Sequence, residues 1–215
     1  MNLLFDLDGT LTDSRPGIVA CIRHALERCG VASPNDERLQ ACIGPPLRHS
    51  FAQMLVAHVD DACVGHAIAA YRERFSTIGM FENAVYEHIP TVLDDLLRRG
   101  ARLYVATSKP QIYAERILEH FGLANRFIAI FGSGLDGTRE NKGELVAHAV
   151  KSAALEPGET VMFGDRLHDM HGAIANDVYP AGVLWGYGSD EELRAAGAKT
   201  LLSAPIDIPK FLGSM

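Results

Sequence analysis

Two carboxylates spaced one residue apart directly follow an apolar run near the start of the chain. Residues 3–5 (Leu-Leu-Phe) are typical of a short buried strand, and Asp6, Asp8 and Gly9-Thr10 come straight after it. Because residues i and i+2 of a strand point to the same side, both carboxylates start on one side of the chain. Two close acids repel unless positive charge lies between them. The pair therefore predicts a site for a divalent cation, and oxygen ligands favour Mg²⁺, although Asp and Gly also form ordinary turns.

Polar residues that could do chemistry also end two later apolar runs. Residues 103–106 precede Thr107-Ser108-Lys109, residues 160–163 precede Gly164-Asp165, and Lys142 begins a predicted helix between them. The carboxyl ends of parallel strands lie at one edge of a sheet. We therefore expect these groups to meet the first pair of acids in one crevice.

The residue types in this group suit phosphoryl transfer. A carboxylate can attack phosphorus, and a second acid can protonate the leaving oxygen and then activate water. A hydroxyl and a lysine can hold the phosphoryl oxygens, where charge must be neutralised. Asp6 and Asp165 can ligate Mg²⁺, which offsets the repulsion between carboxylates and phosphate.

The secondary structure predicted for the chain differs between two regions, which together must position these residues. Residues 15–79 carry apolar residues at helical spacing and no strand pattern, which predicts an all-helical insert. Residues 1–14 and 80–215 alternate short strands with helices, which predicts βαβ units and a parallel sheet. The predicted strands are 3–5, 103–106, 127–131, 160–163 and 178–184. The expected fold is α/β, with a Rossmann-like three-layer α/β/α core and a small helical domain.

Composition limits the classes of partner. The net charge is −7 with no basic run, which argues against a nucleic acid polymer. No apolar run reaches transmembrane length, and no basic segment of a signal peptide is present at the N-terminus. The four cysteines fit neither a zinc site nor a redox pair; they are Cys21, Cys29, Cys42 and Cys63. We expect a cytoplasmic protein with reduced thiols that acts on a small molecule, as a monomer or homodimer.

Four motifs together resemble those of the haloacid dehalogenase superfamily, in the same order and over essentially the whole chain. They are Asp6-Leu-Asp8-Gly-Thr-Leu, Thr107-Ser-Lys, Lys142 and Gly164-Asp165-Arg-Leu-His-Asp169. The resemblance implies that Asp6 is the nucleophile and Asp8 the general acid/base. It also implies that the helical insert is a cap that closes over the site.

The same resemblance assigns the binding residues. Thr107 matches the phosphate-binding hydroxyl and Lys142 the phosphate-binding lysine. Asp165 matches a Mg²⁺ ligand, to which the side chain of Asp6 and the backbone carbonyl of Asp8 would add. Asp169 matches a second acid that supports the water shell of the metal or the lysine.

Details of the motifs narrow the branch. Dehalogenases of the superfamily lack the second aspartate, transport ATPases place Lys-Thr after the nucleophile, and β-phosphoglucomutases usually carry Val where this chain has Thr10. Residues 107–110 and 164–166 resemble the phosphoglycolate-phosphatase-like branch, while residues 43–48 and 182–188 resemble a subgroup described as 5′-nucleotidases. We therefore predict a Mg²⁺-dependent phosphatase of a small phosphorylated metabolite. The preferred substrates are nucleoside 5′-monophosphates, with phosphoglycolate as the alternative. A sugar-phosphate mutase and a phospho-aspartate receiver module are less favoured functions.

The roles of several side chains in or near the motifs are open between two interpretations. Arg48 and Lys109 are candidate specificity residues, but each is equally well explained as a solvated cation. Thr107 is favoured over Ser108 as the phosphate ligand, although either hydroxyl or its backbone N–H could serve.

Other residues have a simpler structural explanation. Trp185 and Tyr187 could stack on a base, yet core packing or a dimer contact explains them more simply. His168 and His171, three residues apart on a predicted helix, could bind a metal but are better explained as a surface pair.

Overall fold

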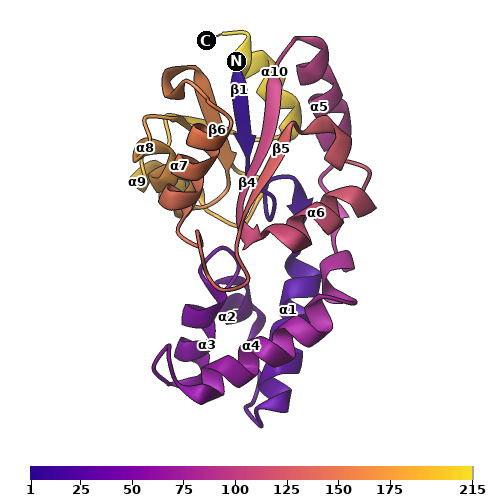
Figure 1. Ribbon diagram of the computed structural model, residues 1–215, viewed down its shortest axis with the longest axis vertical. Coiled ribbons are helices and arrows are strands. Elements are labelled where there is room, and N and C mark those ends of the chain that lie inside the picture. The colour runs from indigo at the N-terminus through magenta and orange to yellow at the C-terminus, as the bar shows by residue number, and fades with distance from the viewer. Residues whose placement is uncertain (215) are drawn as a thin grey trace. The chain divides into compact units, whose positions relative to one another are not determined.

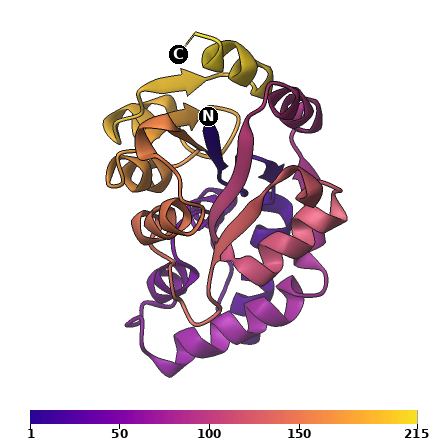
Figure 2. The same cartoon turned by 45° about the horizontal axis from the view of Figure 1, so that its top comes forward.

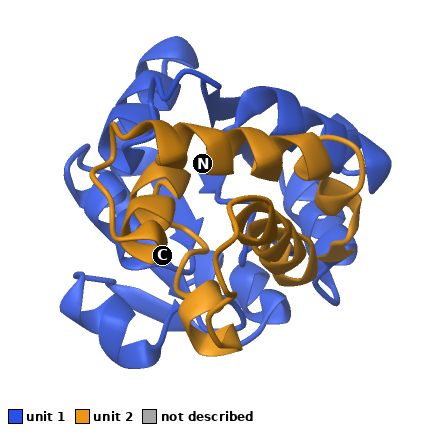
Figure 3. Ribbon diagram, turned by 90° about the horizontal axis from the view of Figure 1, so that it is seen from below, with its two compact units in different colours: residues 1–13, 85–215 blue, residues 14–84 orange. Residues whose placement is uncertain are grey.

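The computed structural model describes residues 1–214 and contains two compact units, one of residues 1–13 and 85–215 and one of residues 14–84. The boundaries lie within a few residues of the expected core (1–14 and 80–215) and insert (15–79). Figure 3 shows the larger unit in blue and the smaller in orange.

The larger unit is built on one parallel sheet. Its strands are β1 (Asn2–Phe5), β4 (Arg102–Pro110), β5 (Ala129–Ser133), β6 (Thr160–Gly164), β7 (Tyr179–Val183) and β8 (Thr200–Leu202). Their order is β5-β4-β1-β6-β7-β8, and every neighbouring pair is parallel. All four residues of β1 are buried, and the apolar run at residues 3–5 fits this burial, because a central parallel strand is covered on both faces.

Helices cover both faces of this sheet. They are α5 (Ile89–Arg98), α6 (Gln111–His120), α7 (Lys142–Ser152), α8 (Leu167–Ile174), α9 (Asp190–Ala195) and α10 (Ile208–Leu212). Leu4 of β1 packs in a cluster with Leu145 of α7 and Ala173 of α8. The next residue, Phe5, points to the opposite face, where it stacks on Phe163 with ring centroids 4.9 Å apart. The sheet therefore lies between two helical layers, as the sequence predicted (Figures 1 and 2).

The chain changes direction at β1. From β1 it continues to β4 and β5 on one side, and then crosses to β6, β7 and β8 on the other. Ligands of open α/β sheets bind at such a switch point, outside the carboxyl ends of the strands. Asp6 and Asp165 directly follow β1 and β6, and Thr107 lies near the carboxyl end of β4, the other neighbour of β1.

Two expectations about the larger unit need correction. β5 begins at Ala129 rather than at Phe127, because residues 124–126 form a 3₁₀ turn that delays the strand. The short strand β8 and the helices α9 and α10 were not predicted, since each spans only three to six residues and carries little periodicity.

The smaller unit is helical, as predicted. It contains α1 (Arg15–Arg28), α2 (Asp36–Gln40), α3 (Leu47–Leu55) and α4 (Ala62–Phe75). Aromatic contacts join α3 to α4: Phe51 meets the edge of the Tyr71 ring, which stacks on Phe75. The guanidinium of Arg74 forms two hydrogen bonds with the carboxylate of Glu82, at 2.6 and 2.9 Å.

The remaining elements are short. The strands β2 (Thr12–Asp13) and β3 (Ala84–Val85) form a separate two-stranded sheet. Single 3₁₀ turns occupy residues 79–81, 124–126, 157–159 and 205–207. Within residues 1–214, no helix combines the length and apolar character needed to cross a membrane. All four cysteines are free thiols.

Candidate active site

Asp6 and Lys142 form the centre of the site. Asp6 follows the last residue of β1, where its backbone N–H donates to the carbonyl of Phe163 on the neighbouring strand. The ammonium of Lys142 lies 2.8 Å from Oδ1 of Asp6 and 3.0 Å from the carbonyl oxygen of Ala106. Both charged side chains are almost fully buried, so each depends on the other for compensation of its charge.

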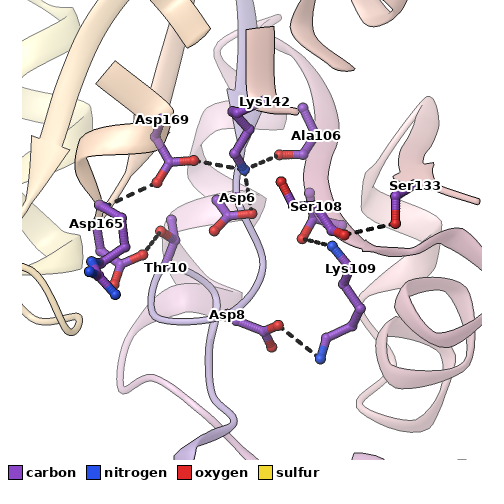
Figure 4. A network of polar contacts seen from close by, with 12 residues as sticks. Asp6, Asp8, Thr10, Ala106, Ser108, Lys109, Ser133, Lys142, Asp165 and Asp169 are labelled. Atoms are coloured by element: carbon purple, nitrogen blue, oxygen red, sulfur yellow. Dashed lines mark hydrogen bonds and ion pairs between the residues drawn. The ribbon is translucent and has the colours of Figure 1, made fainter. Parts of the chain in front are cut away.

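Asp169 is the second anion beside the lysine. Its Oδ1 lies 2.7 Å from Nζ of Lys142, and its Oδ2 accepts a hydrogen bond from the backbone N–H of Arg166. Burial lowers the pKa of Lys142, but the charges of Asp169 and Asp6 outweigh burial and raise that pKa above its ordinary value. The lysine is therefore a permanent ammonium, and Figure 4 shows it between the two carboxylates.

A third buried acid completes an anionic cluster. Oxygen atoms of Asp6, Asp165 and Asp169 lie within 4.8 Å of one another. Burial, together with the charges of Asp169 and Asp6, raises the pKa of Asp165 well above its usual range. Burial also raises the pKa of Asp169 to about 6, despite the opposing charge of Lys142. One ammonium among three carboxylates leaves the cluster short of positive charge.

This chemistry fits a divalent cation. Hard carboxylate oxygens are the ligands that Mg²⁺ prefers, and a cation near Asp165 would remove the repulsion that raises its pKa. Asp169 already uses one oxygen on Lys142 and the other on a backbone N–H. Asp169 is thus committed to the lysine, and Asp6 and Asp165 stay the predicted side-chain ligands. In the described part of the chain, this is the one group of three His, Cys, Asp or Glu residues arranged to hold a metal.

A segment that sequence reasoning did not assign to the site, residues 185–188, fixes Asp165. The backbone N–H of Tyr187 donates to Oδ2 of Asp165 at 2.8 Å. The indole Nε1–H of Trp185 donates to the carbonyl of Thr10, whose hydroxyl is 3.4 Å from Oδ1 of Asp165. The phenol of Tyr187 donates to Oδ1 of Asp13. Trp185 and Tyr187 therefore link Asp165 to the loop that follows the first acidic pair.

Two glycines allow this close approach. Gly9 has φ +84°, which favours glycine, and a Cβ built there would lie 2.2 Å from Oδ2 of Asp165. A Cβ on Gly186 would lie 2.3 Å from Cβ of Asp165 and 2.4 Å from the carbonyl oxygen of Gly9. The signal in the sequence was the Trp-Gly-Tyr-Gly run one residue after the end of β7, the strand beside β6.

Thr107 is the last residue of β4 before its register shifts, Ser108 is the first after it, and their hydroxyls have different surroundings. The hydroxyl of Ser108 donates to the carbonyl of Glu140, and its own carbonyl accepts from Ser133. The Thr107 hydroxyl accepts from the backbone N–H of Lys109 and keeps its own proton for donation. Of the two hydroxyls, Thr107 is thus the better placed for a phosphoryl oxygen, while Ser108 holds the loop that leads to Lys142.

Asp8 and Lys109 form a second buried ion pair. The Lys109 ammonium lies 2.8 Å from Oδ2 of Asp8. Lys109 is only 9% exposed, so its interpretation as a solvated cation is wrong. Figure 4 shows this pair beside, and separate from, the Lys142 group.

The remaining candidates lie elsewhere. Arg48 is in the smaller unit, at the start of α3, where its exposed guanidinium donates to the carbonyl of Val59 at 2.8 Å. A role for it in substrate binding stays a prediction. His168 and His171 lie together on α8 but outside the acidic cluster.

With this geometry in view, comparison with known proteins identifies the family. Residues 3–183 match the family model of haloacid dehalogenase-like hydrolases. The chain belongs to this family. The resemblance found in the four motifs is thereby confirmed.

Two relatives and one solved structure illustrate the match. A 5′-nucleotidase of Pseudomonas aeruginosa is 48% identical over 194 residues, which cover 90% of this chain and 87% of that protein. The tyrosine-protein kinase PtkA of Mycobacterium tuberculosis is 41% identical over 186 residues, or 86% of this chain but only 62% of the kinase.

The solved structure is that of a predicted phosphatase from Clostridium acetobutylicum. It superposes with a TM-score of 0.94 at 38% identity and covers 100% of this chain and 98% of its own. The hydrolase family and these phosphatase homologues establish the chain as a phosphoric monoester hydrolase.

Proposed function

We propose that this hydrolase is Mg²⁺-dependent and works through an aspartyl phosphate on Asp6. The observation that carries the proposal is the arrangement around Asp6: a buried carboxylate at the end of β1, held by Lys142, with a second acid two residues away. A carboxylate in such a position can act as a nucleophile. The nearby ammonium of Lys142 can then stabilise the negative charge of the phosphoryl group that Asp6 attacks.

The cation would be held by Asp6, Asp165 and the backbone carbonyl of Asp8. When bound, it would supply positive charge to the phosphoryl oxygens and bring the anionic substrate to an anionic pocket. Trp185 and Tyr187 keep Asp165 in place for this role. Asp169 instead holds Lys142.

In the first step, an oxygen of Asp6 attacks phosphorus and the bond from phosphorus to the leaving oxygen breaks. Asp8 gives its proton to that oxygen, so that the product leaves as a neutral alcohol. Lys142 uses its three N–H donors on Asp6, Asp169 and Ala106. The carboxylate of Asp6 loses its charge when it is phosphorylated, and the donor directed at it becomes available to the phosphoryl group.

In the second step, Asp8 takes a proton from water as that water attacks phosphorus. The bond between phosphorus and Asp6 breaks, inorganic phosphate leaves, and the Asp6 carboxylate is restored. The Thr107 hydroxyl and Lys142 neutralise the phosphoryl oxygens in both steps. A proton from water thus replaces the one that Asp8 gave to the leaving alcohol, and a bond from phosphorus to water oxygen replaces the bond to that alcohol.

The substrates that we propose are nucleoside 5′-monophosphates. The 48% identical 5′-nucleotidase supports this class, as do the cap segment at 43–48 and the segment at 182–188. The kinase among the relatives points to another acceptor for the same aspartyl phosphate, a tyrosine hydroxyl in place of water. Phosphate release and phosphoryl transfer to protein distinguish these two fates.

The test is a phosphate-release screen in Mg²⁺ across nucleoside monophosphates, phosphoglycolate and sugar phosphates. The expected result is turnover that is highest with a nucleoside 5′-monophosphate and absent in Asp6→Asn. A strong preference for phosphoglycolate over every nucleotide would overturn the substrate class. Interconversion of sugar phosphates without phosphate release would overturn hydrolysis. Transfer of the phosphoryl group to protein instead of water would overturn it too.

A further inference from the structure

We propose that Lys109 is the positioning residue of Asp8: its ammonium holds one carboxylate oxygen and leaves the other for proton transfer. The inference rests on the proposed role of Asp8 as general acid and base. It gives Lys109 a task different from the substrate specificity expected from its sequence.

The contact itself is short and sheltered from solvent. Nζ of Lys109 lies 2.8 Å from Oδ2 of Asp8, and the two side chains are 5% and 16% exposed. Water screens such a pair weakly, and a long lysine side chain this deeply buried has few alternative rotamers. The pair therefore fixes the direction of the carboxylate rather than contributing a loose surface contact.

The two oxygens of Asp8 have different surroundings. Oδ2 has the ammonium, whereas Oδ1 is buried and has no hydrogen-bond partner among residues 1–214. An unsatisfied buried carboxylate oxygen is costly and calls for an explanation. A general acid needs such an oxygen, because an atom already engaged by a protein donor cannot also exchange a proton with the leaving group or water.

The backbone explains why Lys109 can reach Asp8. β4 pairs regularly with β5 up to Thr107, and the register then shifts before Pro110. Within this irregular segment, the N–H of Lys109 donates to the Thr107 hydroxyl. Since β4 is the direct neighbour of β1, the shift places a lysine beside the loop that carries Asp8. One short segment thus serves both the phosphoryl group, through Thr107, and the acid, through Lys109.

A lysine that only bound the substrate would have different consequences. Its loss would weaken substrate binding and raise KM for every phosphate monoester alike. Loss of a residue that positions the acid lowers the rate of the chemical step instead. It does so most for leaving groups that cannot depart without a proton.

The experiment compares Lys109→Met with Lys109→Arg, which keeps the charge, and with Lys151→Met, which removes an exposed lysine on α7. Single-turnover rates are measured with a nucleoside 5′-monophosphate, whose alkoxide needs a proton, and with p-nitrophenyl phosphate, whose leaving group does not. The rates of Asp8→Asn show how large the effect is when the general acid is lost completely. Circular dichroism checks that each variant is folded.

Lys109→Met is expected to slow the first step by about 100-fold or more with the nucleotide, since general acid catalysis contributes about 10²–10⁴-fold. With p-nitrophenyl phosphate the first step should change by less than about 5-fold. Because the second step still needs Asp8 as a base, this variant should show a burst of nitrophenolate followed by slow turnover. Lys109→Arg should restore most of the rate, and Lys151→Met should match the wild type.

Equal losses with both substrates, or a rise in KM alone, would overturn the inference and make Lys109 a substrate ligand. Unchanged rates in a folded Lys109→Met would overturn it too. Failure of the underlying function is distinct, because the wild type would then release no phosphate from any monoester. If Lys109→Met does not fold, a drop for the nucleotide alone in Lys109→Gln supports the inference, and an equal drop for both substrates overturns it.

Discussion

Lys142 lies 2.8 Å from Oδ1 of Asp6, although 136 residues separate them in the sequence. Asp6 directly follows strand β1, and Lys142 is the first residue of helix α7. The contact joins the expected nucleophile to the charge that would stabilise its phosphorylated form.

Removing the lysine charge should damage both activity and stability. Lys142→Met leaves Asp6 and Asp169 buried without their cation, which typically costs about 3–5 kcal/mol. Turnover should fall by about 10²–10³-fold, as when an electrostatic stabiliser of a transition state is lost. Urea unfolding and phosphate release measure the two effects. Lys151→Met, at an exposed position of the same helix, should change neither, and similar losses there would contradict a special role for Lys142.

A methyl group at Gly186 should disturb the metal site. In Gly186→Ala the new Cβ would meet Asp165 and the carbonyl of Gly9 at under 2.5 Å, so the acid must shift. Calorimetric titration should show Mg²⁺ affinity reduced by about 10–100-fold, the usual effect of disturbing groups that orient a ligand. Gly158→Ala, where a Cβ meets nothing within 4 Å, is the matched control. Wild-type affinity in Gly186→Ala would contradict the placement of the metal at Asp165.

Trp185 should report metal binding by fluorescence. It is the single tryptophan of the chain, and its indole N–H donates to Thr10, a neighbour of Asp165. Titration with Mg²⁺ should change its emission with the same midpoint as calorimetry. The change should disappear in Asp165→Asn. A full response in that variant would mean that the cation binds elsewhere.

Stability of the metal-free protein should depend on pH. Burial, with the charges of Asp169 and Asp6, raises the pKa of Asp165, and burial raises the pKa of Asp169 from 3.8 to about 6. Between the ordinary pKa of an aspartate and these raised values, the folded state binds more protons than the unfolded state. The free energy of unfolding therefore falls as the pH rises. In the presence of EDTA, the deprotonation of these two acids should make Tm decrease as the pH is raised from about 4.5 to about 6.5.

Mg²⁺ should act in the opposite direction, because a cation needs deprotonated carboxylates and competes with protons. The increase in Tm on adding Mg²⁺ should therefore be larger above the pKa of Asp169 than below it. Asp165→Asn should remove most of that increase. An equal increase at all pH values would show that the buried acids are not the ligands.

The elements that carry the acids were predictable for a physical reason. β1 and β6 are buried on both faces and contain the apolar runs 3–5 and 161–163, and each strand is followed directly by an aspartate. Because the carboxyl ends of parallel strands share one edge of a sheet, Asp6 and Asp165 were expected in one crevice, and the structure adds that their strands are direct neighbours. Lys142 was recognisable from its position at a helix start, with Asn141 capping the helix.

The surroundings of those acids were not predictable. The partner of Lys109 depends on a register shift within β4, which no periodicity announces. The role of Trp185 depends on a hydrogen bond to a carbonyl 175 residues earlier, and a half-buried tryptophan has several equally plausible partners in a sequence. Ser108 looked like an alternative phosphate ligand, and only its bond to Glu140 separates it from Thr107.

The most direct test is to trap the phosphorylated enzyme. Rapid acid quenching during turnover of a nucleoside 5′-monophosphate, followed by borohydride reduction and peptide mass spectrometry, locates the acyl phosphate. The account predicts modification at Asp6 alone, absent in Asp6→Asn and accumulating in Asp8→Asn with p-nitrophenyl phosphate. Modification at another residue, or turnover by a folded, Mg²⁺-loaded Asp6→Asn, would contradict it.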